Sequence, residues 1–165
     1  MRIIYVHHAE RKIGESHHDP VLKQLEDITD NGIKEAELLA LKFKSNKQNI
    51  KAIYTSPYLR CSHTAEILNK YLNVEIIEDE RFNEMKKGEE WQQLLTRNME
   101  AIDDIVDKYD NDDAIVCVTS GVNLSAFICY FYNIEATNNV PWSQAVNLSP
   151  INFVVTSKKG KYDLD

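Results

Sequence analysis

The sequence predicts an α/β fold, a three-layer domain in which helices flank a mostly parallel central sheet. Short β-rich apolar runs alternate with amphipathic helical segments along the chain, and this alternation is typical of such folds. One run, residues 114–118, is apolar throughout and too short for a helix, as expected of a central strand in a parallel sheet. The chain has 165 residues and no linker rich in Pro, Gly or Ser, so we expect a single domain over residues 1–165.

The chain opens with an expected strand–loop–helix unit. Residues 2–6 are a short β-rich run, and a polar loop follows over residues 7–27. The next segment, up to residue 44, places its apolar residues on one face at three- and four-residue spacing, which predicts an amphipathic helix. Thr29 or Asp30 caps that helix, because a side-chain oxygen at this position accepts from an unpaired amide of the first turn.

The same alternation continues to the end of the chain. Residues 52–55 predict a second strand, and Ser56-Pro57 predicts the start of a helix that ends near Tyr71, since Ser caps well and Pro suits a first turn. The remaining expected elements are a strand over 74–77, a charged loop to 90, a helix over 91–109, the central strand over 114–118, a helix over 121–132, a strand over 152–156 and an edge strand around Tyr162.

Charge and composition exclude several classes of function. The chain carries 19 Lys and Arg against 26 Asp and Glu, a net charge of -7, which argues against nucleic acid and anionic membranes as partners. No apolar stretch approaches the roughly 20 residues of a membrane span, and the opening residues do not resemble a signal peptide, so we expect a cytoplasmic protein. The motifs GxGxxG, GxxxxGK[ST], GxSxG and HExxH are absent, and the three cysteines form no CxxC pair.

Polar side chains follow three of the expected strands. The first strand is followed by His7-His8-Ala9-Glu10, the second by Ser56 and then Arg60, and the central strand by Thr119-Ser120-Gly121. Ligands of α/β sheets bind beyond the carboxyl ends of the strands, where these residues should meet. A neutral imidazole can attack phosphorus, and a guanidinium holds phosphoryl oxygens well. The alternative is that the histidine is solvated and the arginine merely pairs with a glutamate.

Four segments match a set of family patterns. Residues 3–10 fit a strand followed by Arg-His-Gly-Glu, and residues 28–36 fit Leu-Thr-x-x-Gly-x-x-Gln-Ala. Residues 56–65 match Ser-Pro-x-x-Arg-x-x-x-Thr-Ala, the most specific of the four, and residues 82–91 are similar to Leu-x-Glu-x-x-x-Gly-x-x-Trp. In these patterns the chain resembles the histidine phosphatases, or phosphoglycerate mutase-like superfamily, over most of its length.

This resemblance implies a fold, an activity and a set of site residues. It implies a phosphoglycerate mutase-like fold and hydrolysis of a phosphomonoester through a phosphohistidine on His8, with Glu84 as the general acid. His7, Arg60 and Ser120 would then bind the phosphate, with no metal and no organic cofactor. The partner would be a phosphorylated small molecule or a phosphoprotein.

Two positions of the family's phosphate pocket are altered here, and they leave the activity open. His7 stands where the family has its first Arg, and Ser120 stands where it has its second His. In one outcome, His8 still reacts and His7 supplies charge when protonated, which favours weak activity at mildly acidic pH. In the other, the chain is a catalytically degenerate member that binds a phosphorylated ligand or a partner protein.

A metal site is a further alternative. Neutral imidazoles with a carboxylate can hold Zn²⁺ or a similar ion. Adjacent histidines seldom aim at one point, however, and the spacing is not that of a zinc site. His63, one turn beyond Arg60, is expected on a polar helix surface. The candidate ligands for such a site are His7, His8, His17, His18 and Asp19.

Overall fold

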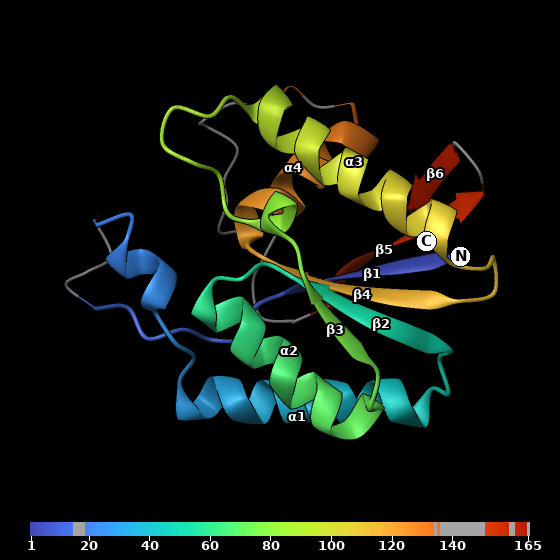
Figure 1. The fold of residues 1–165 in the computed structure, drawn as a ribbon, viewed down its shortest axis with the longest axis horizontal. Helices are drawn as coiled ribbons and strands as arrows, with labels where there is room; N and C mark the ends of the chain where they lie inside the picture. Colours follow the sequence, from blue (N-terminus) through green and yellow to red (C-terminus); the bar gives the residue numbers. More distant parts are fainter. Residues whose placement is uncertain (15–18, 134, 136–150, 159–160, 165) are drawn as a thin grey trace.

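The computed structural model describes residues 1–14, 19–133, 135, 151–158 and 161–164, and these contain a six-stranded sheet in the order β3-β2-β4-β1-β5-β6 (Figure 1). Neighbouring strands β3, β2, β4 and β1 run parallel, whereas β5 and β6 pair antiparallel at the far side. The sheet is therefore mostly parallel, as predicted. The strands are β1 (Arg2–His7), β2 (Ile50–Thr55), β3 (Glu75–Glu78), β4 (Ala114–Thr119), β5 (Ile151–Lys158) and β6 (Lys161–Leu164).

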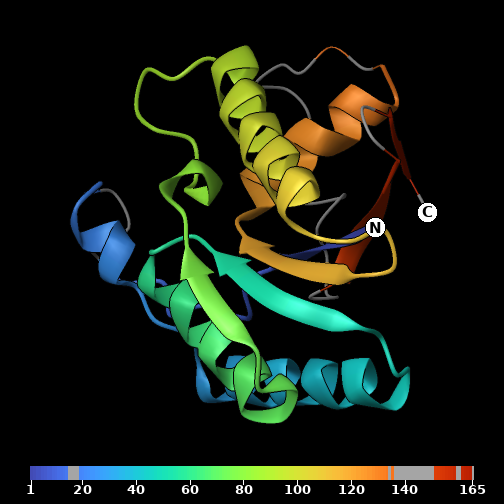
Figure 2. The same ribbon diagram turned by 45° about the vertical axis from the view of Figure 1, so that its right-hand side comes forward.

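Helices cover both faces of this sheet and complete the three predicted layers. Helices α1 (Asp30–Ser45) and α2 (Leu59–Leu72) lie on one face, and α3 (Trp91–Lys108) and α4 (Gly121–Phe131) lie on the other (Figures 1 and 2). Two short 3-10 helices, η2 (Leu22–Leu25) and η3 (Glu80–Phe82), lie in the connections. No helix in the described part of the chain is long and apolar enough to cross a bilayer.

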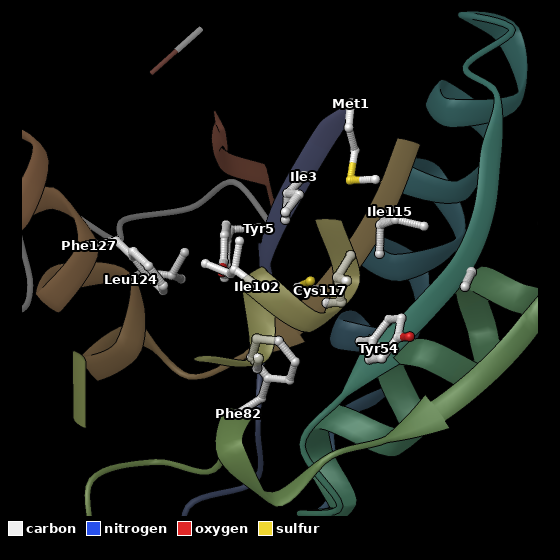
Figure 3. Close-up of a cluster of buried hydrophobic side chains, with 13 residues drawn as sticks. Met1, Ile3, Tyr5, Tyr54, Phe82, Ile102, Ile115, Cys117, Leu124 and Phe127 are labelled. Atoms are coloured by element: carbon white, nitrogen blue, oxygen red, sulfur yellow. The ribbon is translucent and has the colours of Figure 1, made fainter. Parts of the chain in front are cut away.

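Alternate residues of β1 pack into two hydrophobic clusters, one on each face of the sheet. Ile3 and Tyr5 point toward α3 and α4, where the Tyr5 ring lies 4.6 Å from the ring of Phe127, centroid to centroid (Figure 3). Ile4 and Val6 point toward α1 and α2 instead. Because side chains alternate along a strand, an uninterrupted apolar run is what a strand buried on both faces requires.

The predicted central strand is confirmed, and it fixes the edge where the site lies. All six residues of β4 are buried between β2 and β1. His7 pairs with Thr119 in the β1–β4 register, and the His8 amide donates to the Thr119 carbonyl at 3.0 Å. On the other side the Ser56 amide donates to the Val118 carbonyl at 3.1 Å. The residues that follow three strands are thus held side by side by backbone hydrogen bonds.

Helix α1 confirms its predicted cap, whereas α2 begins later than predicted. The Thr29 hydroxyl accepts from the Gly32 amide at 2.9 Å, which caps α1. Helix α2 begins at Leu59, because the Ser56 hydroxyl accepts from the Tyr58 amide at 3.2 Å and holds Ser56-Pro57 in a turn before the helix.

Helix α3 buries a face that is displaced from the apolar stripe that its sequence predicts. The predicted stripe consists of Trp91, Leu95, Met99, Ile102, Val106 and Tyr109. Of these only Ile102 is buried, and the buried face consists of Leu94, Asn98, Ala101, Ile102 and Ile105. The displacement arises because Asn98 is buried, and apolar periodicity does not predict a polar residue to be buried. Its side chain is buried because it donates to the Leu94 carbonyl at 2.8 Å and accepts from Asn123 at 3.0 Å.

Candidate active site

His8 is buried at the end of β1 and held in one tautomer. Its side chain is only 6% exposed, and its Nδ1 lies 2.9 Å from the Ala9 carbonyl oxygen. A carbonyl can only accept, so Nδ1 carries the hydrogen, and the neutral ring has its lone pair on Nε2. Burial lowers the pKa of His8 well below 6.5, and the positive charges of Arg60 and Arg11 act in the same direction. The imidazole is therefore neutral at neutral pH.

His7 lies against His8 and is neutral as well. The two rings are tilted, with centroids 4.1 Å apart. Burial, followed by the charges of Arg11 and Arg60, lowers the pKa of His7 to about 4. The expectation that His7 supplies positive charge at mildly acidic pH is therefore wrong for the free protein, because two nearby cations and the loss of hydration oppose its protonation.

Arg60 and Glu84 meet in an ion pair. Arg60 is fully buried at the start of α2, and its Nη2 donates to Glu84 Oε2 at 2.6 Å. Lys23 Nζ donates to the other carboxylate oxygen of Glu84 at 2.8 Å, and the Lys23 carbonyl accepts from Arg60 Nη1 at 2.9 Å. The alternative in which the arginine pairs with a glutamate thus holds in the free protein, although this glutamate is itself a predicted site residue.

Glu84 is ionised in this arrangement. Burial alone would raise the pKa of its carboxyl, but the hydrogen bond and charge of Lys23, together with Arg60 and Arg11, outweigh burial and lower it. A general acid must carry a proton, so the free protein holds Glu84 in the wrong form for that role.

Arg11 is a further cation at this edge, three residues after His8 in the chain. Its Nη1 lies 3.2 Å from Oε2 of the buried Glu26. Its backbone is fixed by a β-bridge to Ile28, and its charge reaches His7 and His8. Five residues form what we call the charged cluster: Arg11, Lys23, Glu26, Arg60 and Glu84.

Ser120 belongs to a separate set of buried polar groups. Its hydroxyl donates to Asn123 Oδ1 at 2.7 Å. Asn123 Nδ2 lies 3.1 Å from the Asn83 carbonyl and 3.3 Å from the Phe82 carbonyl, and Ser56 donates to Asn83 Oδ1 at 2.5 Å. The hydroxyl hydrogen of Ser120 is thus bound within the protein. This set, which we call the amide network, comprises Ser56, Asn83, Asn98, Ser120 and Asn123.

The segment after His8 is fastened to the start of α1. The Thr29 amide donates to the Glu10 carbonyl at 2.8 Å, and a Cβ added at Gly32 would lie 2.4 Å from that carbonyl oxygen. Only glycine leaves room for this approach, so the Leu-Thr-x-x-Gly pattern positions the backbone beside the histidines.

Structure brings together most of the predicted site residues, and it adds two. Arg60 is ion-paired with Glu84, and both of their charges act on His7. The ring of His8 lies against that of His7, and Ser120 follows the strand paired with β1. Sequence reasoning missed Lys23 and Arg11. Arg11 could have been noticed as a charge close to His8, whereas nothing in the polar loop marks Lys23.

Among the described residues, the remaining candidates form no second site. His63 lies 2.7 Å from Asp27, on a partly exposed helix face. His17 and His18 lie outside the described residues, and within the described ranges no group of three His, Cys, Asp or Glu side chains could hold a metal ion. Burial raises the pKa of Cys61 to about 12 and that of Cys117 further, so both remain inert thiols.

Comparison with known proteins places this arrangement in a family. The model of the histidine phosphatase superfamily (branch 1) matches residues 16–94 and 85–162, which together span more than half of the chain. The chain therefore belongs to the histidine phosphatase superfamily. Neither matched range includes His8, so the role of that residue rests on the geometry above. No curated protein matches the sequence.

Solved structures share the fold at low sequence identity. YhfR of Bacillus stearothermophilus is 19% identical with a TM-score of 0.79, and the match covers 99% of this chain and 94% of that one. Phosphoserine phosphatase of Entamoeba histolytica, in complex with 3-phosphoglyceric acid, is 18% identical with a TM-score of 0.73 and the same coverage. The protein histidine phosphatase SixA, complexed with tungstate, is 14% identical with a TM-score of 0.67, covering 100% of this chain and 94% of that one. These likenesses show a phosphoglycerate mutase-like phosphatase fold.

Proposed function

We propose that the protein hydrolyses a phosphomonoester through a phosphohistidine on His8. The observation that carries this proposal is the state of His8, a buried neutral imidazole whose Nδ1 is held by the Ala9 carbonyl at 2.9 Å. Its lone pair is on Nε2, and the positive charge of the fully buried Arg60 guanidinium acts on this ring. A neutral nitrogen nucleophile next to a fixed positive charge suits attack on a phosphoryl group.

In the first step, Nε2 of His8 attacks phosphorus, and the bond from phosphorus to the ester oxygen breaks. Glu84 gives a proton to that leaving oxygen. In the second step, Glu84 takes a proton from water, the water oxygen bonds to phosphorus, and the phosphorus–nitrogen bond breaks. Inorganic phosphate leaves, and His8 is neutral again.

Glu84 must gain a proton before it can act as the acid. In the free protein, Lys23 and Arg60 hold its two carboxylate oxygens at 2.8 and 2.6 Å. A phosphate dianion would compete for these cations and add negative charge beside the carboxylate, and both changes raise the pKa of Glu84. Substrate binding itself would thus prepare the acid.

The substrate class that fits this chemistry is a phosphorylated small molecule or a phosphorylated protein. Similar structures include a phosphoserine phosphatase and a protein histidine phosphatase, one of each kind.

The test is a hydrolysis assay on phenyl phosphate with two histidine variants. His8→Ala should lower kcat/KM by roughly 10³-fold or more, as expected when a nucleophile is removed. His63→Gln removes an imidazole outside the site and should retain the activity. Rapid acid-free quenching should trap a phosphoprotein that is stable in alkali and labile in acid, and His8→Ala should not form it. Equal hydrolysis by wild type and His8→Ala would reject the proposal.

A catalytically degenerate binder is the second candidate, and one observation favours it. Neither altered position supplies charge, because His7 is neutral down to about pH 4 and the Ser120 hydroxyl donates to Asn123. Tungstate binding without any turnover above that of His8→Ala, at every pH, would support this candidate instead.

A further inference from the structure

The family pattern places positive charge at two positions that are neutral here, so the charge that holds a phosphate dianion must come from elsewhere. We propose that Arg11 and Lys23 bind the phosphoryl oxygens together with Arg60, and so replace the charge that residues 7 and 120 do not carry. This inference rests on the proposed function and names the residues that would recognise the substrate.

Lys23 already contacts an anion together with Arg60. Its Nζ donates to one oxygen of the Glu84 carboxylate at 2.8 Å, and Arg60 donates to the other at 2.6 Å. Like the Glu84 carboxylate, a phosphoryl group offers negatively charged oxygens that could accept hydrogen bonds from Lys23 and Arg60. Because the side chain of Lys23 is 26% exposed, a ligand can reach it from solvent.

The backbone of Lys23 is fixed independently of its side chain. Its carbonyl accepts from Arg60 Nη1 at 2.9 Å, and the short helix η2 that carries it lies beside the start of α2 (Figure 1). A substitution of the Lys23 side chain should therefore leave the backbone contact between residue 23 and Arg60 in place.

Arg11 approaches from the chain segment that follows His8. The β-bridge to Ile28 and the hydrogen bond from the Lys12 amide to the Asp27 carbonyl, at 2.8 Å, hold this segment. Arg11 Nη1 lies 3.2 Å from Glu26 Oε2, and the Arg11 side chain is 21% exposed. Arg11 follows the end of β1 by four residues, at the same edge of the sheet as His8. Its charge lowers the pKa of both imidazoles and of Glu84.

The charged cluster also holds a donor with no protein acceptor. Nε of Arg60 is buried, and within the described part of the chain nothing accepts its hydrogen. A buried donor of a charged group is costly to leave unpaired, so its partner is expected to be a ligand. With three cations against two carboxylates, the cluster has one positive charge in excess for an incoming dianion.

Isothermal titration with tungstate tests the proposal without requiring turnover. Arg11→Ala and Lys23→Ala should each weaken tungstate binding by about 10- to 100-fold, the range expected for one lost charged hydrogen bond. The matched control is Lys12→Ala, an exposed cation next to Arg11, which should change the affinity by less than about twofold. Arg11→Lys and Lys23→Arg should keep most of the affinity.

Two further variants distinguish direct binding from a structural role. If Lys23 only positions Glu84, then Lys23→Ala should have no effect in a Glu84→Gln background, whereas direct binding keeps the full loss there. If Arg11 replaces the charge missing at position 7, then His7→Arg should restore tungstate binding to Arg11→Ala.

The proposal is overturned if both alanine variants bind tungstate within twofold of wild type, or if the Lys23 effect vanishes with Glu84→Gln. Its failure differs from failure of the proposed function. Hydrolysis that survives His8→Ala removes the catalytic proposal and leaves the tungstate affinities to decide this one.

Discussion

The two polar clusters at the strand ends are built on opposite principles. In the amide network, neutral side chains from the turn after β2, from the residue after η3, from α3 and from the start of α4 bind one another, and every member is buried. In the charged cluster, three cations are paired with two carboxylates of the same chain, and Lys23 and Arg11 are partly exposed. One cluster therefore keeps its hydrogen bonds inside the protein, whereas the other can exchange its partners.

This difference separates the residues that stabilise the site from those that could bind or react with a ligand. When one partner of a buried neutral hydrogen bond is removed, the other is left with neither a protein partner nor water. The amide network should therefore contribute to stability. A carboxylate held by Lys23 and Arg60 can be replaced by another anion without stranding a charge. We therefore expect substitutions in the charged cluster to change binding and turnover more than stability, and the reverse for the amide network.

Glu84→Gln should give the largest effect, and it divides binding from turnover. Removing the negative charge frees Arg60 and Lys23, so tungstate should bind several-fold more tightly. Loss of the proton donor should lower kcat by roughly 10²-fold or more on phenyl phosphate, whose leaving group needs a proton. The loss should be smaller on 4-nitrophenyl phosphate, whose leaving group does not. Equal losses on both substrates, measured by steady-state kinetics, would contradict the role of Glu84 as an acid.

Asn123→Ala should be the most damaging change in the amide network. Its side chain contacts Ser120, Asn98 and the carbonyls of Phe82 and Asn83, all of which would lose a buried partner. The free energy of unfolding in urea should fall by roughly 3 kcal/mol.

Two further variants should lower the free energy of unfolding by less. Ser120→Ala should cost about 1 kcal/mol, because only the hydrogen bond to Asn123 is lost. Asn31→Ala, an exposed asparagine that donates to Glu10, should cost less than that. An unchanged urea midpoint for Asn123→Ala would show that the network does not hold the site.

Acidification should lower stability through the two imidazoles. His7 has a pKa of about 4 in the folded protein, against about 6.5 in an unfolded chain. Between these values the unfolded state binds more protons, so the free energy of unfolding falls as the pH is lowered. From about pH 7 to about pH 5 we expect a loss on the order of 2 kcal/mol from His7, with His8 adding to it.

His7→Gln should flatten this pH dependence, whereas Ser120→Ala, which removes no titratable group, should leave it in place. Urea denaturation at a series of pH values measures both. If stability is constant between about pH 7 and about pH 5, the histidines are not buried in their neutral form.

Sequence predicted the fold well because its determinants are local or periodic. The apolar run of β4 and the Thr29 cap are confirmed. The start of α2 was misplaced because the Ser56 hydroxyl caps the Tyr58 amide instead of a helical one, and part of its bonding goes to Asn83. The buried face of α3 was misplaced because apolar periodicity takes no account of a satisfied polar residue such as Asn98.

Residues of the site were predicted only in the segments that match a family pattern or that directly follow a predicted strand. Arg60 and Glu84 lie in matched segments, but their ion pair depends on how two distant loops fold toward each other. The position of Lys23 depends on η2, which formed inside a loop with no periodicity. The protonation of His7 could not be predicted from its residue type, because burial and two cations decide it.

The alignment of β1 with β4 has a consequence for redesign. The hydrogen bond from the His8 amide to the Thr119 carbonyl sets the spacing between residues 8 and 120 through the main chain alone. The main-chain distance between residues 8 and 120 should therefore stay the same whichever side chain occupies position 120. An engineer who wanted a second imidazole opposite the first would thus need no new scaffold, only Ser120→His and enough room beside Asn123 to seat it.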